Sequence, residues 1–86
     1  MQLKNYMEDA VEQMMDRVLK DIDVCKCERC RMDIKALALN NLPPKYVVTE
    51  EGELYVKTNE LVRQFEVDII KAITMAAMKV KENPRH

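Results

Sequence analysis

The segment from residue 25 to residue 44 reads CKCERCRMDIKALALNNLPP, and it predicts a cysteine-rich turn, a helix and a helix stop in succession. The helix runs from about Glu28 to Asn40, with Cys30 in its first turn. Its buried face, with apolar residues three and four positions apart, consists of Ile34, Leu37 and Ala38. Pro43 and Pro44 end the helix, because each removes a backbone donor and disfavours helical conformation in the residue before it.

An earlier helix is predicted upstream, because apolar residues recur there at steps of three and four. This apolar stripe consists of Leu3, Met7, Val11, Met14, Val18 and Ile22. Asn5 can cap a helix that starts near Tyr6, with Glu8 three residues after the cap. A start nearer Leu3 is the alternative. Residues 21–24 end this helix and lead into the cysteines.

The longest predicted helix lies downstream, from Thr58 or Asn59 to about Lys81. Its apolar positions are Leu61, Val62, Phe65, Val67, Ile69, Ile70, Ala72, Ile73, Ala76, Ala77, Met78 and Val80. A helix that is apolar on most sides is buried on most sides. Two other helices cannot cover so much apolar surface, so we expect the remainder to pack against a second copy of the chain, in a homodimer.

Between the second and third helices, residues 46–48 and 54–56 are β-prone and flank the only glycine, Gly52. They predict either a small hairpin or a plain extended loop, since an isolated two-stranded hairpin is marginally stable. The composition, with 48% hydrophobic residues, one Gly and no Trp, agrees with an all-α fold. We therefore predict a single small three-helix domain over residues 1–86.

Charge and hydropathy exclude several broad classes of function. The formal net charge is −1, so no overall field attracts nucleic acid or an anionic membrane. No apolar run is long enough to span a bilayer and no signal-peptide core is visible, so we expect a cytoplasmic protein. The sequence also lacks a glycine-rich phosphate loop, a nucleophile elbow and a histidine near a candidate nucleophile, so we expect no enzymatic activity.

The cysteines at positions 25, 27 and 30 form the one specific chemical signal, C-x-C-x-x-C. In a reducing compartment this crowding indicates metal binding or redox chemistry rather than a disulfide scaffold. Thiolates suit zinc, and a structural zinc ion would add stability that a chain of 86 residues otherwise lacks. Cys30 at a helix N-terminus is favoured as a thiolate. The plainer interpretation is three reduced thiols without a metal.

A structural zinc ion takes four ligands, and the fourth is not local. His86 is the only histidine, and it can close a Cys₃His site if the last helix packs antiparallel to the second. Asp23, Glu28, a water or a group of a partner chain is the alternative. The plainer interpretation of His86 is a solvated terminal residue. An iron–sulfur cluster would lack its fourth cysteine, and a thioredoxin-like role for Cys27 and Cys30 lacks the surrounding βαβ pattern.

The cysteine block continues as RMDIKALALN and then LPPKYV at residues 42–47, with KNYME at residues 4–8 and ENPRH at residues 82–86. These stretches resemble the ComFB (late competence development) family over essentially the whole chain. The resemblance implies a small helical homodimer that binds zinc through Cys25, Cys27, Cys30 and a residue near the C-terminus. Some relatives carry a C-terminal cysteine where this chain has His86, which is a chemically sound replacement.

A first functional hypothesis follows from the residues and the resemblance together. The chain is expected to be a non-enzymatic, zinc-binding, homodimeric scaffold or regulator. The family name refers to an operon linked to DNA uptake, which suggests a role in competence.

The alternative is a receptor for a cyclic dinucleotide, c-di-GMP or c-di-AMP, because some family members are associated with such ligands. Here the ligand would contact Asn5, Arg29, Arg31 and Lys35. The plainer interpretation of the basic residues Arg29, Arg31 and Lys35 is ordinary solvated helix surface. A thiol redox protein is the third and least favoured hypothesis.

Overall fold

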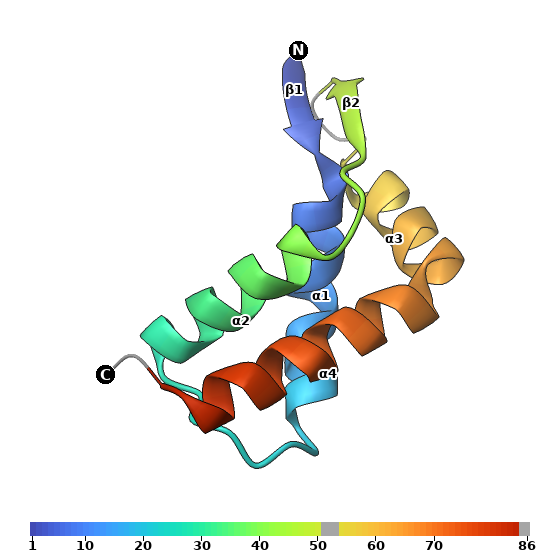
Figure 1. The fold of residues 1–86 in the computed structure, drawn as a ribbon. Helices are drawn as coiled ribbons and strands as arrows, with labels where there is room; N and C mark the ends of the chain where they lie inside the picture. Colours follow the sequence, from blue (N-terminus) through green and yellow to red (C-terminus); the bar gives the residue numbers. More distant parts are fainter. Residues whose placement is uncertain (51–53, 85–86) are drawn as a thin grey trace.

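The computed structural model describes residues 1–50 and 54–84, which form four helices and two short strands (Figure 1). In chain order the elements are β1 (Gln2–Asn5), α1 (Tyr6–Leu19), α2 (Glu28–Asn40), β2 (Tyr46–Thr49), α3 (Leu54–Gln64) and α4 (Glu66–Glu82). The predicted helical fold is confirmed. The predicted number of three helices is wrong, and the small sheet was not expected in this form.

The helices assemble around α1, which packs against α2, α3 and α4. The helices α2 and α4 run side by side in opposite directions, across the same side of α1 (Figure 1). Their shared core includes Met15 and Leu19 of α1, Ile34 of α2, and Ile69 and Ile73 of α4, all at most 1% exposed. The antiparallel packing brings the end of α4 towards the start of α2, where the cysteines lie.

The first helix begins at Tyr6, as predicted from its cap. The side chain of Asn5 accepts a hydrogen bond from the backbone N–H of Met7 at 3.1 Å. The alternative start near Leu3 is wrong, because Leu3 lies in β1. The predicted limits of the second helix, Glu28 and Asn40, are confirmed.

Residues 46–48 form a strand as expected, but their partner is not residues 54–56. Strand β2 pairs antiparallel with β1, with Leu3 opposite Val48 and Asn5 opposite Tyr46. Residues 54–56 open α3 instead, so both alternatives for them, the hairpin and the extended loop, are wrong. Gly52, the predicted turn, lies outside the described residues. Strand β2 forms because it pairs with residues 2–5, about forty residues earlier in the chain. Local strand preferences cannot predict such a distant partner.

The predicted last helix is bent into two, α3 and α4, at Phe65. Helical hydrogen bonding continues across the bend: the Phe65 N–H donates to the Leu61 carbonyl, and the Ile69 N–H to the Phe65 carbonyl, both at 2.9 Å. The ammonium group of Lys45 lies 4.9 Å from the centre of the Phe65 ring, a cation–π contact at the bend. Because of the bend, α3 and α4 run in different directions, and both pack against α1 (Figure 1).

Helix α4 buries one face against α1 and α2. Its buried residues are Ile69, Ala72, Ile73, Ala76, Ala77 and Val80. On the opposite side Val67, Met75 and Met78 stay exposed, with 77%, 56% and 47% of their surface accessible. One chain therefore covers much, but not all, of the apolar surface that the sequence places in this helix.

Candidate metal centre

The loop between α1 and α2 delivers the three cysteines to one place. The end of α1 is closed by turns, in which the Ile22 N–H donates to the Leu19 carbonyl at 3.2 Å and the Val24 N–H to the Ile22 carbonyl at 3.0 Å. Val24 is buried in the core, and it anchors the loop one residue before Cys25. The approach to the first cysteine is thus fixed by packing as well as by turns.

Cys27 caps the N-terminus of α2. Its sulfur accepts the backbone N–H of Cys30 at 3.4 Å, and its carbonyl accepts the N–H of Arg31 at 2.9 Å. Cys27 thus takes the position that Ser, Thr, Asp or Asn usually fills at a helix start. The capping geometry turns the chain so that Cys27 and Cys30 lie next to each other.

The sulfur atoms of Cys25, Cys27 and Cys30 all lie within 4.8 Å of one another. In a tetrahedral zinc site with Zn–S distances of about 2.3 Å, ligand sulfurs lie about 3.8 Å apart, so only a small contraction would be needed. Cys30 is buried, whereas Cys25 and Cys27 are exposed. The predicted thiol cluster is therefore present as a group that could hold a metal ion.

The pKa values of Cys27 and Cys30 are shifted in opposite directions. The N–H of Cys30, and then the Cys25 thiol, stabilise a thiolate on Cys27, which lowers the pKa of Cys27. Burial, and then the neighbouring Cys27 thiol, raises the pKa of Cys30 to about 12. Cys27 is therefore favoured as a thiolate. The prediction that Cys30 is the favoured thiolate is wrong for the metal-free chain, because burial outweighs the helix N-terminus and raises the pKa of Cys30. A bound cation would compensate the charge of its thiolate.

The structure places the candidates for a fourth ligand differently. His86 lies outside the described residues. Among the described residues, Asp23 and Glu28 do not belong to the cluster of donor atoms that the three cysteines form. Asp23 is instead 4.0 Å from the ammonium group of Lys81 near the end of α4.

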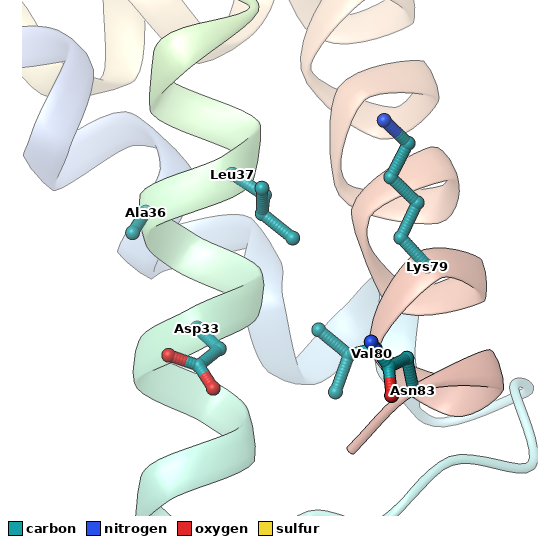
Figure 2. Close-up of a pocket in the computed structure, with 6 residues that line it drawn as sticks. All are labelled: Asp33, Ala36, Leu37, Lys79, Val80 and Asn83. Atoms are coloured by element: carbon teal, nitrogen blue, oxygen red, sulfur yellow. The ribbon is translucent and has the colours of Figure 1, made fainter. Parts of the chain in front are cut away.

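A groove between α2 and α4 places the end of α4 beside the second and third turns of α2. It has a volume of about 390 Å³ and is lined by Asp33, Ala36 and Leu37 of α2 and by Lys79, Val80 and Asn83 at the end of α4 (Figure 2). Helices α2 and α4 are therefore antiparallel, as a metal ligand from the residues after α4 requires. The structure supports this arrangement up to Asn83.

The basic residues proposed for an anionic ligand do not form one site with Asn5. Arg31 is bound by α1, at 2.7 Å from Asp16 and 3.7 Å from Glu12. Lys35 lies 3.1 Å from Glu12. Asn5 lies at the other end of α2, where its side-chain oxygen accepts the N–H of Lys45 at 2.8 Å. Arg29 is exposed at the start of α2.

Sequence reasoning missed the carboxylates that neutralise Arg31 and Lys35. A signal was available: Glu12 and Asp16 are four residues apart on one helix, and Arg31 and Lys35 are four apart on the next. Equal spacing places both pairs on matching faces when the helices pack. The cap formed by Cys27 was also missed, because cysteine is an unusual N-cap residue.

The comparisons with known proteins match nearly the whole chain. The family model for the late competence development protein ComFB matches residues 4–84. The chain belongs to the ComFB family. Competence protein ComFB of Bacillus subtilis (strain 168) is 28% identical over 83 residues, which cover 95% of this chain and 85% of that protein.

A solved structure of a ComFB protein has the same fold. The structure described as the late competence protein ComFB from Bacillus subtilis matches with a TM-score of 0.84 and 29% identity, over 96% of this chain and 94% of that one. In the described part of this ComFB chain, no helix has both the length and the apolar character that crossing a bilayer demands.

Proposed function

We propose that this protein binds one structural zinc ion per chain through Cys25, Cys27 and Cys30. The observation that carries the proposal is the convergence of three sulfur atoms within 4.8 Å on a capped helix start. Three thiolates without a cation would repel one another, whereas a soft divalent cation satisfies all three. Zinc is the metal that such sites in small folds most often hold, and it would fasten the loop that follows α1 to the first turn of α2.

For the fourth ligand we propose His86. The support is indirect: α4 runs antiparallel to α2, and Asn83 lines the same groove as Asp33, in the second turn of α2 (Figure 2). Three further residues span at most about 10 Å when extended. Cys30 precedes Asp33 by three residues, about 4.5 Å of helix rise, which is shorter than this reach.

The biological role proposed is a cytoplasmic, non-enzymatic, homodimeric scaffold or regulator that acts in competence. The relatives are named as competence proteins. Their names support a role in competence, but they specify no molecular activity. A zinc ion with four protein ligands keeps no open position for a substrate, which supports binding rather than catalysis.

Zinc content and thermal stability of the untagged full chain test the proposal. Native mass spectrometry and elemental analysis of the wild type are expected to give one zinc ion per chain. Chelation is expected to lower the melting temperature by roughly 10 °C or more, because metal-binding free energy is folding free energy. Cys27→Ser removes one thiolate but leaves a hydroxyl that can cap α2. It is expected to lose the metal.

Arg29→Ser is the matched control, because Arg29 lies in the same turn, is exposed and offers no ligand. It is expected to keep both metal and stability. A metal-free wild type whose melting curve ignores the chelator would overturn the proposal. If that protein also formed a reversible disulfide between Cys27 and Cys30, the thiol redox hypothesis would replace it.

The alternative function, a cyclic-dinucleotide receptor, has one supporting observation. Arg31 and Lys35 line a groove of about 360 Å³ together with Met15 and Met32, so charged and apolar side chains are available side by side. Against it, both cations already pair with carboxylates of α1. Titration calorimetry with c-di-GMP and c-di-AMP decides between these: micromolar binding that Arg31→Ala abolishes supports the receptor, and no heat with either ligand removes it.

A further inference from the structure

The three cysteines of the candidate metal centre differ in their exposure to solvent. Cys25 and Cys27 are exposed, whereas Cys30 is only 1% exposed and belongs to the core cluster that also contains Val24 and Ile34. A small molecule in solution can therefore reach Cys25 and Cys27 without any opening of the fold. The centre has an accessible side, formed by these two residues, and a protected side, formed by Cys30.

The two exposed cysteines also lie outside the body of α2. Cys25 is in the connecting loop and Cys27 is the N-cap residue, whereas Cys30 lies in the first turn of the helix. Residues two positions apart span at most about 7 Å between their Cα atoms, and a disulfide needs about 4.4–6.8 Å. The sulfur atoms already lie within 4.8 Å of one another. A movement of the loop alone can therefore join Cys25 to Cys27, without displacing a core side chain.

We propose that Cys25 and Cys27 are an oxidation site for peroxides, at which a disulfide between them removes two metal ligands and releases the zinc ion. The proposal rests on the zinc site of the proposed function and adds a means of regulating it. After oxidation only Cys30 and the proposed fourth ligand, His86, would remain. A structural zinc ion takes four protein ligands, so two are too few to retain it.

The oxidation takes place in two steps on sulfur. The thiolate of Cys27 attacks one oxygen of hydrogen peroxide and the O–O bond breaks. The sulfur becomes a sulfenic acid, and the other oxygen takes a proton from solvent and leaves as water. The thiolate of Cys25 then attacks the sulfenic sulfur of Cys27, the S–O bond breaks, and the departing hydroxide takes a second proton and leaves as water. Two electrons thus pass from the two sulfur atoms to the peroxide.

The surrounding fold does not depend on Cys25 or Cys27. Neither residue belongs to the hydrophobic core. The loop has two attachments that need no metal: Val24 is buried in the core, and the ammonium group of Lys26 donates to the carbonyl of Ile22 at 2.9 Å. Oxidation is therefore expected to give a folded, zinc-free chain whose buried Cys30 is still a thiol, and reduction is expected to restore zinc binding.

Zinc release from the untagged full chain tests the proposal. Zinc content is measured first, and the zinc-loaded protein is then treated with hydrogen peroxide while a chromogenic chelator reports free zinc. We expect release of one zinc ion per chain, reversed by dithiothreitol and added zinc. Trypsin cleaves after Lys26 and Arg29, so each cysteine lies on its own peptide. Peptide mapping is expected to find Cys25 joined to Cys27, and Cys30 alkylated by iodoacetamide only after denaturation.

Met32→Leu is the matched control, because Met32 is 63% exposed near the centre and is itself open to oxidation by peroxide. This variant is expected to release zinc as the wild type does. The oxidation site is overturned if peroxide leaves zinc bound, if release occurs without a disulfide between Cys25 and Cys27, or if Met32→Leu prevents release. The proposed zinc site survives each of these results. A wild type that is zinc-free before peroxide is added overturns both proposals.

Discussion

Asn5 holds the backbone N–H of Lys45 at 2.8 Å through the same side-chain oxygen that caps α1 by accepting the N–H of Met7 at 3.1 Å. One amide oxygen thus joins the start of α1 to the segment that leads from α2 into β2. The residue proposed from the family resemblance as a ligand contact has this structural role in the fold. Its substitution therefore has a predictable cost even without any ligand.

Asn5→Ala is expected to lower the free energy of unfolding by about 2 kcal/mol, because it removes a helix cap and leaves a second N–H without its acceptor. Asn5→Asp keeps an accepting oxygen and is expected to stay within about 1 kcal/mol of the wild type. Urea denaturation followed by circular dichroism measures both. If Asn5→Ala matched the wild type, water would have to satisfy both N–H groups equally well.

The two roles of Cys27, cap and ligand, separate when serine and alanine are compared. In the presence of chelator, Cys27→Ala is expected to be about 1 kcal/mol less stable than Cys27→Ser, because alanine cannot cap α2. Both variants are expected to lose the stabilisation that zinc gives the wild type. Equal stability of the two variants without metal would show that the sulfur contributes nothing as a cap.

Thiol alkylation in the metal-free protein follows the opposite pKa shifts of Cys27 and Cys30. A lowered pKa places the thiolate of Cys27 at lower pH than usual, so its alkylation rate is expected to rise first as pH increases. Cys30, with a pKa of about 12 and a buried side chain, is expected to react slowest throughout the neutral range. Peptide mapping by mass spectrometry after timed iodoacetamide labelling reads each site. Faster labelling of Cys30 than of Cys27 would contradict the capped geometry.

The ion pair between Arg31 and Asp16 is expected to contribute little to stability. Asp16 is largely exposed, and pairs of this kind give about 0.2–1 kcal/mol, less in high salt. Asp16→Asn is therefore expected to lower the free energy of unfolding by less than about 1 kcal/mol at low salt, and by almost nothing in 1 M NaCl. Denaturation at the two salt concentrations measures this, with Glu8→Gln on the same helix as control. A loss above about 2 kcal/mol would show a buried, strongly coupled network instead.

The sequence predicted the helices whose limits are set locally. Asn5 predicted the start of α1, and Pro43 and Pro44 predicted the end of α2. Both predictions were possible because caps and prolines act on their immediate neighbours. The cysteines were recognised for the same reason, since their spacing of two and three residues already confines them. These features needed no knowledge of distant contacts.

The parts that were missed depend on distant partners. Strand β2 pairs with residues 2–5, and residues 54–56 become helical although their side chains favour strands. The bend at Phe65 occurs without proline or glycine, and Lys45, twenty residues earlier, contacts its ring. The matched pairs of α1 and α2 could be recognised only once the two helices were known to be neighbours.

The central position of α1 has a consequence for synthesis on the ribosome. About 50 residues separate the end of α1 from Ile69, the first buried residue of α4, and adding them takes roughly 3–10 s at ordinary translation rates. Until α4 is made, the apolar side of α1 can pack only against α2 and, later in the interval, α3, so the part of α1 that α4 covers stays exposed on the nascent chain. The cysteine loop emerges early in this interval, so a zinc ion captured there would fix the connection between α1 and α2 before α4 is made.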